Sequence, residues 1–220
     1  MSETSDPRSP LTSGDPRADA VHVPSGTVAD DRRVIYEGDQ VLLRMITAAD
    51  EAEFVALAKT SKEQFRPFRP WPMAPTKPSR FRRYMSRYGA EGVFGFVVCL
   101  RTTKAIVGFI DITVGSNVWH LRQGEVAYAT FVAHQKHGYM TEALSLAIRY
   151  GFEQLRLDRL QAEILSENTA SLRLAEKVGF LKEGSSIEHH IEDGVEIDLW
   201  SITREQVDTY PMYARVDDQP

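Results

Sequence analysis

The stretch from residue 93 to residue 155 restricts the possible folds more than any other part of the sequence. Residues 93–101 form a nearly continuous apolar run, and residues 105–114 pair with it naturally across a short polar turn. A third strand, residues 124–131, leads through another polar turn into a helix. The apolar residues of this helix recur at 3.6-residue spacing: Leu144, Ala147, Ile148, Gly151, Phe152 and Leu155. One stripe of the helix is therefore expected to face a sheet.

The segments before this stretch read as strand, helix, loop and helix. Residues 40–45 have a strand pattern, and Thr47 is a plausible cap for a helix that continues to residue 57. Residues 66–72 contain too many prolines for a helix or a central strand. Ser79 then caps a basic, aromatic helix that ends near Tyr88.

The segments after it read as strand, helix and hairpin. Residues 160–165 form a short strand, Asn168 caps a helix that continues to Lys177, and Gly179 stands where a helix stop is expected. A hairpin follows, with strands 187–191 and 195–202 and the turn Asp193-Gly194 at its tip. This mixture of hairpins and crossovers predicts an α/β (α+β) fold. Its central sheet is mixed and flanked by helices on both faces, in contrast to a doubly wound parallel sheet.

Composition divides the chain into three parts. Residues 1–33 hold four of the 11 prolines and no Phe, Trp or Tyr, so they cannot bury enough apolar surface to fold, and we expect a disordered leader. Residues 34–207 have the size of one domain. Residues 208–220 form a polar tail in which Tyr210, Met212 and Tyr213 are the available anchors.

Charge and cysteine content exclude several classes of protein. The formal net charge of −5 argues against a broad phosphate-binding face, and hence against nucleic acid as the main partner. The single cysteine, Cys99, lies in an apolar strand and reads as a core residue, since one thiol cannot form an intrachain disulfide. No apolar run approaches the roughly 20 residues that span a bilayer, and no signal pattern is present. We expect a cytoplasmic protein without a membrane partner.

The polar turn at residues 131–144 is the strongest candidate for a binding site. A strand that runs through a turn into a helix aims free N–H groups and the positive end of the helix dipole at the turn, where an anion such as pyrophosphate can bind. Gly138 would allow close approach, and Thr141 offers a hydroxyl. On spacing alone this signal is weak, because many such turns contain one glycine.

Four ordered motifs resemble a known family. Gln135-x-x-Gly138-x-Met140 looks like the acetyl-coenzyme A signature of the GCN5-related N-acetyltransferases (GNAT superfamily). The run Gly138 to Ala143 is similar to ribosomal-protein N-acetyltransferases of the RimJ/RimL type. The remaining motifs resemble the strand before the signature, the helix start after it and the last hairpin: residues 125–128, Asn168-x-x-Ser171, and residues 178–180 with 183–184.

The resemblance implies acetyl transfer from acetyl-CoA directly to a primary amine, through a tetrahedral intermediate. Main-chain groups of residues 130–132 would contact the pantetheine arm, a backbone N–H near Phe131 would polarise the thioester, and Asn168 would contact the pantetheine. The implied residues that bind acetyl-CoA are Thr130, Phe131, Val132, Gln135, Lys136, His137, Gly138, Tyr139, Met140, Thr141 and Asn168.

Two residues are implied to be catalytic. Ser171 matches the position that protonates the departing thiolate, although a plain first-turn serine is the alternative. Glu125 is the first candidate for the base that deprotonates the amine, although a solvated carboxylate at a strand edge is about as plausible. Tyr128 is a second contact candidate, or simply a core aromatic. Two departures from the signature are Met140 in place of a small residue and Lys136 where glycine is common.

Acceptor recognition is less clear. Residues 65–71 and the helix that carries Arg80, Phe81 and Tyr84 would form one wall of an acceptor site, or would only pack. The last hairpin has acidic residues that would attract a cationic amine, or would simply be solvated: Glu183, Glu188, Glu192, Asp193, Glu196 and Asp198.

Three alternatives stay open at this point. The chain could be a non-catalytic acyl-CoA-binding or interaction module, or it could use another donor such as succinyl-CoA. It could be a monomer or a homodimer. His134, His137, His189 and His190 lack ligand-like spacing, so no metal is expected.

Overall fold

The computed structural model describes residues 33–66, 74–88, 92–115, 121–188 and 194–213. Its centre is an eight-stranded sheet with the order β1-β2-β3-β4-β5-β6-β8-β7. The strands are β1 Val34–Glu37, β2 Val41–Met45, β3 Val93–Leu100, β4 Ile106–Val114, β5 Gln123–Thr130, β6 Arg159–Leu165, β7 Leu181–Glu188 and β8 Val195–Thr203. Only β5 and β6 pair in parallel; the other neighbours are antiparallel. The predicted mixed sheet is confirmed.

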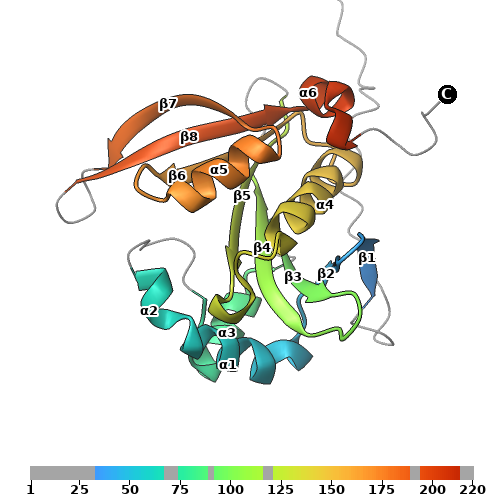
Figure 1. Cartoon of the computed structure of the whole chain (residues 1–220), viewed down its shortest axis with the longest axis vertical. Helices are drawn as coiled ribbons and strands as arrows, with labels where there is room; N and C mark the ends of the chain where they lie inside the picture. The colour runs from blue at the N-terminus through green and yellow to red at the C-terminus, as the bar shows by residue number, and fades with distance from the viewer. Residues whose placement is uncertain (1–32, 67–73, 89–91, 116–120, 189–193, 214–220) are drawn as a thin grey trace, which may run out of the picture.

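Helices cover both faces of the sheet, as the sequence predicts (Figure 1). They are α1 Glu51–Thr60, α2 Lys62–Phe65, α3 Pro78–Met85, α4 Tyr139–Glu153, α5 Thr169–Lys177 and α6 Arg204–Thr209. One core cluster joins α4 and α5 to the sheet and contains the predicted stripe of α4, with Leu144 and Ile148 fully buried. A second cluster joins α1 and α3 to the opposite face through Phe54, Phe81 and Phe109. The sheet therefore separates an α4/α5 face from an α1/α3 face.

Several elements differ from the sequence prediction. The short edge strand β1 and helices α2 and α6 were not expected, although Thr203 and Gln206 form a capping box that signals the start of α6. Helix α3 begins at Pro78 with Lys77 as its N-cap, so the assignment of the cap to Ser79 was wrong. A proline at the first helical position needs no hydrogen-bonded N–H, which explains this start.

Three of the predicted segments lie wholly or mostly outside the described residues, whereas the C-terminal segment is described up to Tyr213. The predicted leader, apart from Arg33, lies outside the described residues, as do residues 67–73 of the proline-rich loop and residues 189–193 at the hairpin tip. Strand β7 begins at Leu181, earlier than predicted. Near the C-terminus Tyr213 is buried, and its hydroxyl donates to the carbonyl of Val178 at 2.7 Å, so packing against the domain continues beyond residue 207.

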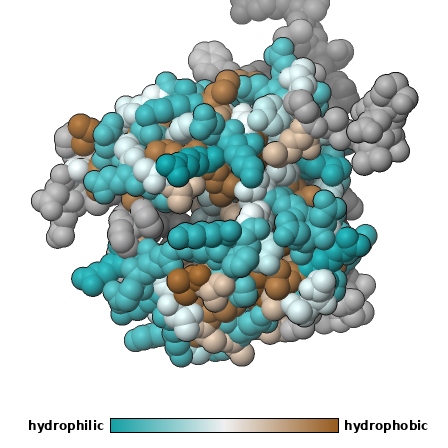
Figure 2. All heavy atoms as spheres, viewed as in Figure 1, coloured by the Kyte–Doolittle hydropathy of each residue, from teal (hydrophilic) through white to brown (hydrophobic). Residues whose placement is uncertain are grey.

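Hydrophilic residues cover most of the face shown in Figure 2, above and below the middle of the molecule. No helix in the described ranges is long and apolar enough to cross a membrane.

Candidate functional site

The parallel pair β5–β6 separates after a short contact. Its paired residues run only from Gln123 with Arg159 to Glu125 with Gln161. At the other edge of β5, the N–H of Phe131 donates to the carbonyl of Val107 at 2.9 Å, so odd-numbered residues of β5 bond to β4. Since main-chain groups alternate in direction along a strand, those of Tyr128 and Thr130 turn toward β6, where no ladder partner follows Glu125 in the described strands. This split exposes main-chain donors and acceptors inside the sheet.

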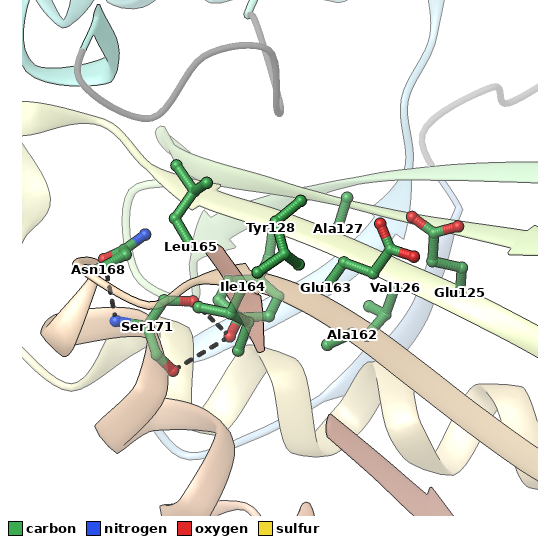
Figure 3. A pocket seen from close by; sticks show the side chains of 11 residues that line it. Glu125, Val126, Ala127, Tyr128, Ala162, Glu163, Ile164, Leu165, Asn168 and Ser171 are labelled. Carbon is green, nitrogen blue, oxygen red and sulfur yellow. Dashed lines mark hydrogen bonds between the residues drawn. The ribbon is translucent and has the colours of Figure 1, made fainter. Parts of the chain in front are cut away.

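A cavity of about 60 Å³ lies in the split (Figure 3). Glu125 and Ala127 of β5 line it together with Glu163 of β6, and Tyr128, Asn168 and Ser171 line it as well. Register places Glu125 and Glu163 on the α1/α3 face, since Glu125 pairs with Gln161 and side chains two residues apart share a face. Tyr128 lies on the α4/α5 face with Ser171. Carboxylates and hydroxyls thus approach the split from opposite sides.

The hydroxyls of Tyr128 and Ser171 lie 2.8 Å apart, and either oxygen can donate. Burial raises the pKa of Tyr128 to about 12, against the opposing effect of its hydrogen bond with Ser171, so the phenol is protonated at neutral pH. The side chain of Asn168 caps α5 by accepting the N–H of Ser171 at 3.2 Å, which confirms the predicted cap. Tyr128 therefore lines the cavity as well as packing against the core.

Glu125 is partly buried, and its pKa is raised, first by burial and second by the negative charge of Glu163. A carboxylate with a raised pKa is a better proton acceptor than an exposed one. Glu125 is thus a partly buried carboxylate beside a second one, and its role as the base stays a prediction.

The turn before α4 has the geometry of an anion site. Gly138 is the N-cap of α4 with φ of +83°, and Lys136 has φ of +63°. A glycine adopts such angles without strain, so the glycine common in the family at the Lys136 position has a conformational reason. In the described part of the chain, no hydrogen bond uses the N–H of Lys136, His137, Gly138, Tyr139 or Met140. These groups can bind an anion at the positive end of α4.

The residues just before that turn are held from α1 and α2. The N–H of Val132 donates to the hydroxyl of Ser61 at 3.0 Å, and the side chain of Gln135 accepts from Gln64 and donates to the carbonyl of Thr130. The N–H of Phe131 is bonded to Val107, and its ring is buried. The N–H of Phe131 itself is therefore not free. The amides of β5 that face the split belong to Tyr128 and Thr130, so an amide N–H next to Phe131 remains available, and its role in polarising the thioester stays a prediction.

Met140 fits because the neighbouring strand provides space. Its side chain is 7% exposed, and a Cβ placed on Gly108 of β4 would lie 2.8 Å from the Met140 methyl carbon. The methionine therefore packs into the core over Gly108 and leaves the open turn free. Thr141 lies in the first turn of α4, where its carbonyl accepts from the Ser145 hydroxyl.

The predicted acceptor wall is only partly present. Phe81 is fully buried and cannot line a site. Arg80 and Tyr84, by contrast, line a second cavity of about 410 Å³ together with Phe65. The rest of the predicted loop lies outside the described residues.

The acidic hairpin is partly neutralised. Glu183 pairs with Arg159 and accepts from Ser201, and Asp198 pairs with Lys182 at 2.8 Å. These two carboxylates are already bonded and are poor attractants for an amine. Glu188 and Glu196 belong to β7 and β8, whereas Glu192, Asp193, His189 and His190 lie outside the described residues.

Cys99 is fully buried in β3, and burial raises the pKa of its thiol to about 11, which fits a core residue. Among the described residues, no group of His, Cys, Asp and Glu side chains is arranged to hold a metal ion.

Sequence reasoning missed Glu163, Ser61 and Gln64. The alternation of Gln161 and Glu163 with Leu160, Ala162 and Ile164 does place Glu163 on the polar face of its strand. Its position beside Glu125, however, depends on the register of a parallel pair, which the sequence does not specify. No local pattern marks Ser61 or Gln64.

The structure thus combines a mixed α/β sheet, one split parallel pair and an open helix N-terminus beside it. Residues 40–181 match the family model described as an acetyltransferase (GNAT) domain. The chain belongs to this family, which confirms the resemblance seen in the sequence.

Relatives that are described as N-acetyltransferases support this assignment. YoaA of Bacillus subtilis, described as an uncharacterized N-acetyltransferase, is 27% identical over 173 residues, which are 77% of this chain and 97% of that protein. YjcK of the same organism, a probable N-acetyltransferase, is 27% identical over 68% of this chain and 85% of its own length.

Solved structures share the fold. RimJ of Mycobacterium smegmatis, in complex with a CoA disulfide, has a TM-score of 0.67 and 23% identity, over 76% of this chain and 84% of its own. RimL, a ribosomal-protein acetyltransferase in complex with coenzyme A, has a TM-score of 0.69 and 14% identity, over 78% of this chain and 98% of its own. The chain is an acetyltransferase, and acetyl transfer from acetyl-CoA is the general reaction of its family. The non-catalytic module is therefore not the favoured alternative.

Proposed function

We propose that this protein transfers the acetyl group of acetyl-CoA directly to a primary amine, either a protein N-terminus or a small-molecule amine. One observation carries the proposal: Glu125 and the Tyr128–Ser171 pair line the same cavity from opposite sides of a split sheet. A direct transfer needs a proton acceptor on the side of the amine and a proton donor on the side of the thiolate. This arrangement offers both.

Acetyl-CoA would lie along the split and across the turn before α4. Its pyrophosphate would accept hydrogen bonds from the N–H groups of residues 136–140, and the hydroxyl of Thr141 would donate another. The pantetheine arm would bond main-chain groups of Thr130 and Tyr128, which turn toward β6, and the side chain of Asn168.

The chemistry would begin at Glu125. Its carboxylate takes a proton from the ammonium, directly or through water, and the free amine nitrogen attacks the thioester carbon. An amide N–H of β5 in the split stabilises the negative oxygen of the tetrahedral intermediate. When the C–S bond breaks, the nitrogen loses its second proton to water, which leaves a neutral amide. The Ser171 hydroxyl gives its proton to the thiolate and recovers one from Tyr128, which is reprotonated from solvent.

The names of relatives support an amine acceptor without selecting one. Proteins of similar fold include a ribosomal-protein-S5-alanine acetyltransferase of Vibrio fischeri, with 21% identity, and a spermidine N-acetyltransferase chimera with 20%. We propose that residues 34–207 form the working domain, that the segment up to Tyr213 packs against it, and that the protein is a cytoplasmic monomer or homodimer.

Two measurements test the proposal. Calorimetry should detect acetyl-CoA binding at sub-millimolar concentration, and its absence would exclude the function. Thiol release should then appear with a panel of N-terminal peptides and polyamines, and stay at background for the non-catalytic alternative. Succinyl-CoA in place of acetyl-CoA tests the donor.

A further inference from the structure

The second cavity carries an unusual concentration of positive charge. It measures about 410 Å³ and lies between the α1–α2 junction and α3. Among the described residues that line it, every charged one is a cation: Lys62, Arg66, Arg80, Arg83 and Arg87. Phe65 and Tyr84 form an aromatic part of the wall. Such a lining suits an anion and repels a polyamine.

Three of the arginines are available for a ligand. Arg66 and Lys62 lie within 3.5 and 3.9 Å of Glu63. For Arg80, Arg83 and Arg87, no ion pair is present among the described residues. Arg82, on another side of α3, pairs with Glu51 at 3.1 Å and does not line the cavity. Helix α3 and the turn that follows it thus direct these guanidinium groups to the cavity.

This cavity adjoins the split of the sheet on the same face. Tyr84 donates from its wall to buried Asp111 at 2.8 Å, and Asp111 is the cross-strand partner of Ala127, which lines the split. Glu125 is two residues from Ala127 along β5. With about 3.4 Å per strand residue and about 5 Å between strands, the path from Glu125 to Tyr84 is roughly 12 to 15 Å.

Charge is therefore separated along this face. Glu125 and Glu163 lie at the end where the amine would react, and the cations lie at the other end. Since an extended peptide advances about 3.3 Å per residue, the cavity wall at Tyr84 is within reach of roughly the fourth residue after the reacting amine, and the cations line the same cavity. A short aminoalkyl phosphate does not bridge this distance.

On the basis of the proposed function, we infer that the acceptor is a peptide or protein N-terminus followed by acidic residues. The amine binds near the carboxylates, and the acidic side chains bind the cavity cations. This assignment selects an acidic N-terminal segment over a polyamine or a basic peptide.

The test uses the full chain and peptides that share an N-terminal serine and differ at positions two to five, where they carry Glu, Gln or Lys. Binding to the CoA-loaded protein is followed by fluorescence anisotropy with a C-terminal dye, and turnover by thiol release. The Glu peptide should bind at least tenfold more tightly than the Lys peptide, and its advantage should shrink between 50 and 500 mM NaCl.

Variants then locate the effect. In Arg80→Ala/Arg83→Ala the affinity for the Glu peptide should fall about tenfold, with little change for the Gln peptide. Arg82→Ala on the same helix is the matched control and should behave as wild type with both peptides. Binding of acetyl-CoA should be unchanged in all variants.

Each other outcome has a definite meaning. Equal binding of the three peptides, a preference for Lys or for a polyamine, or tighter binding of a short oligonucleotide would overturn the inference while acetyl transfer could stand. Selective binding of the Glu peptide without any turnover would instead leave the acidic-segment site in place and contradict the proposed function. Turnover of phosphoethanolamine that is sensitive to the double substitution would replace the peptide by a small phosphorylated amine.

Discussion

The phenol of Tyr128 and the hydroxyl of Ser171 lie 2.8 Å apart across the boundary between β5 and α5. The pair joins the strand that borders the split to the helix that follows it. Because Tyr128 stays protonated at neutral pH, it can resupply a proton to Ser171.

Ser171→Ala and Tyr128→Phe should each lower kcat by about tenfold, since a hydroxyl gives only modest acid assistance to a thiolate. The double variant should be little worse than either single one, because both act in one relay. Steady-state kinetics on all three variants measures this. Multiplicative losses would show that the two hydroxyls act independently.

Glu125→Gln should lower kcat/KM by about a hundredfold, the lower part of the range for general-base catalysis. The wild-type rate should rise with pH as the carboxyl of Glu125 ionises, at a pH above that of an ordinary glutamate, because burial and Glu163 raise its pKa. Glu163→Gln removes one of these causes, so the acidic limb should move to lower pH. A limb that does not move would show that the charge of Glu163 does not act on the titrating base.

Gly138→Ala should weaken acetyl-CoA binding. A Cβ at Gly138 meets nothing within 4 Å, so the effect would come from φ of +83°, which costs an L-residue about 1–2 kcal/mol. The turn would relax and misdirect its N–H groups. Lys136→Gly is the opposite change and should keep affinity, with stability equal or slightly higher. Calorimetry and thermal melting compare the two.

Asp111→Asn should change how stability depends on pH. Burial raises the pKa of Asp111 to about 6, despite hydrogen bonds from Tyr88 and Tyr84. Because its pKa is raised, Asp111 keeps its proton to a higher pH in the folded state than in the unfolded state. The free energy of unfolding of the wild type therefore falls by roughly 3 kcal/mol as the pH rises from about 4 to about 6. In the variant this fall should vanish, as measured by urea unfolding across that pH range. An unchanged slope would mean that folding does not raise the pKa of Asp111.

Periodicity predicted most of the fold because the strands and helices that matter bury one clear face. The stripe of α4 and the apolar run of β3 are both present where expected. The short strand β1, which is half exposed, has too little pattern to be recognised. The start of α3 depended on the fixed φ of Pro78, which outweighed Ser79 as a cap.

The site was less predictable because it depends on contacts between distant segments. Gly138 and Asn168 are residue types with a local preference, glycine for a positive φ and asparagine for a helix N-cap. The structure shows both features at these positions. Glu163 reaches Glu125 only through the register of β5 with β6. In the last hairpin, the sequence does not show that Arg159 and Lys182 form ion pairs with Glu183 and Asp198. These pairs neutralise two carboxylates that appear unpaired in the sequence.

The hydrogen bonds from Ser61 to Val132 and from Gln64 to Gln135 connect α1 and α2 to the segment that precedes the cofactor turn. The same junction carries Lys62 and Phe65 of the cationic cavity. If a ligand in the cavity orders this junction, linkage requires that the acetyl donor and the acceptor alter each other's affinity by the same factor. Measuring the affinity for each substrate with and without the other would then give the same ratio in both directions.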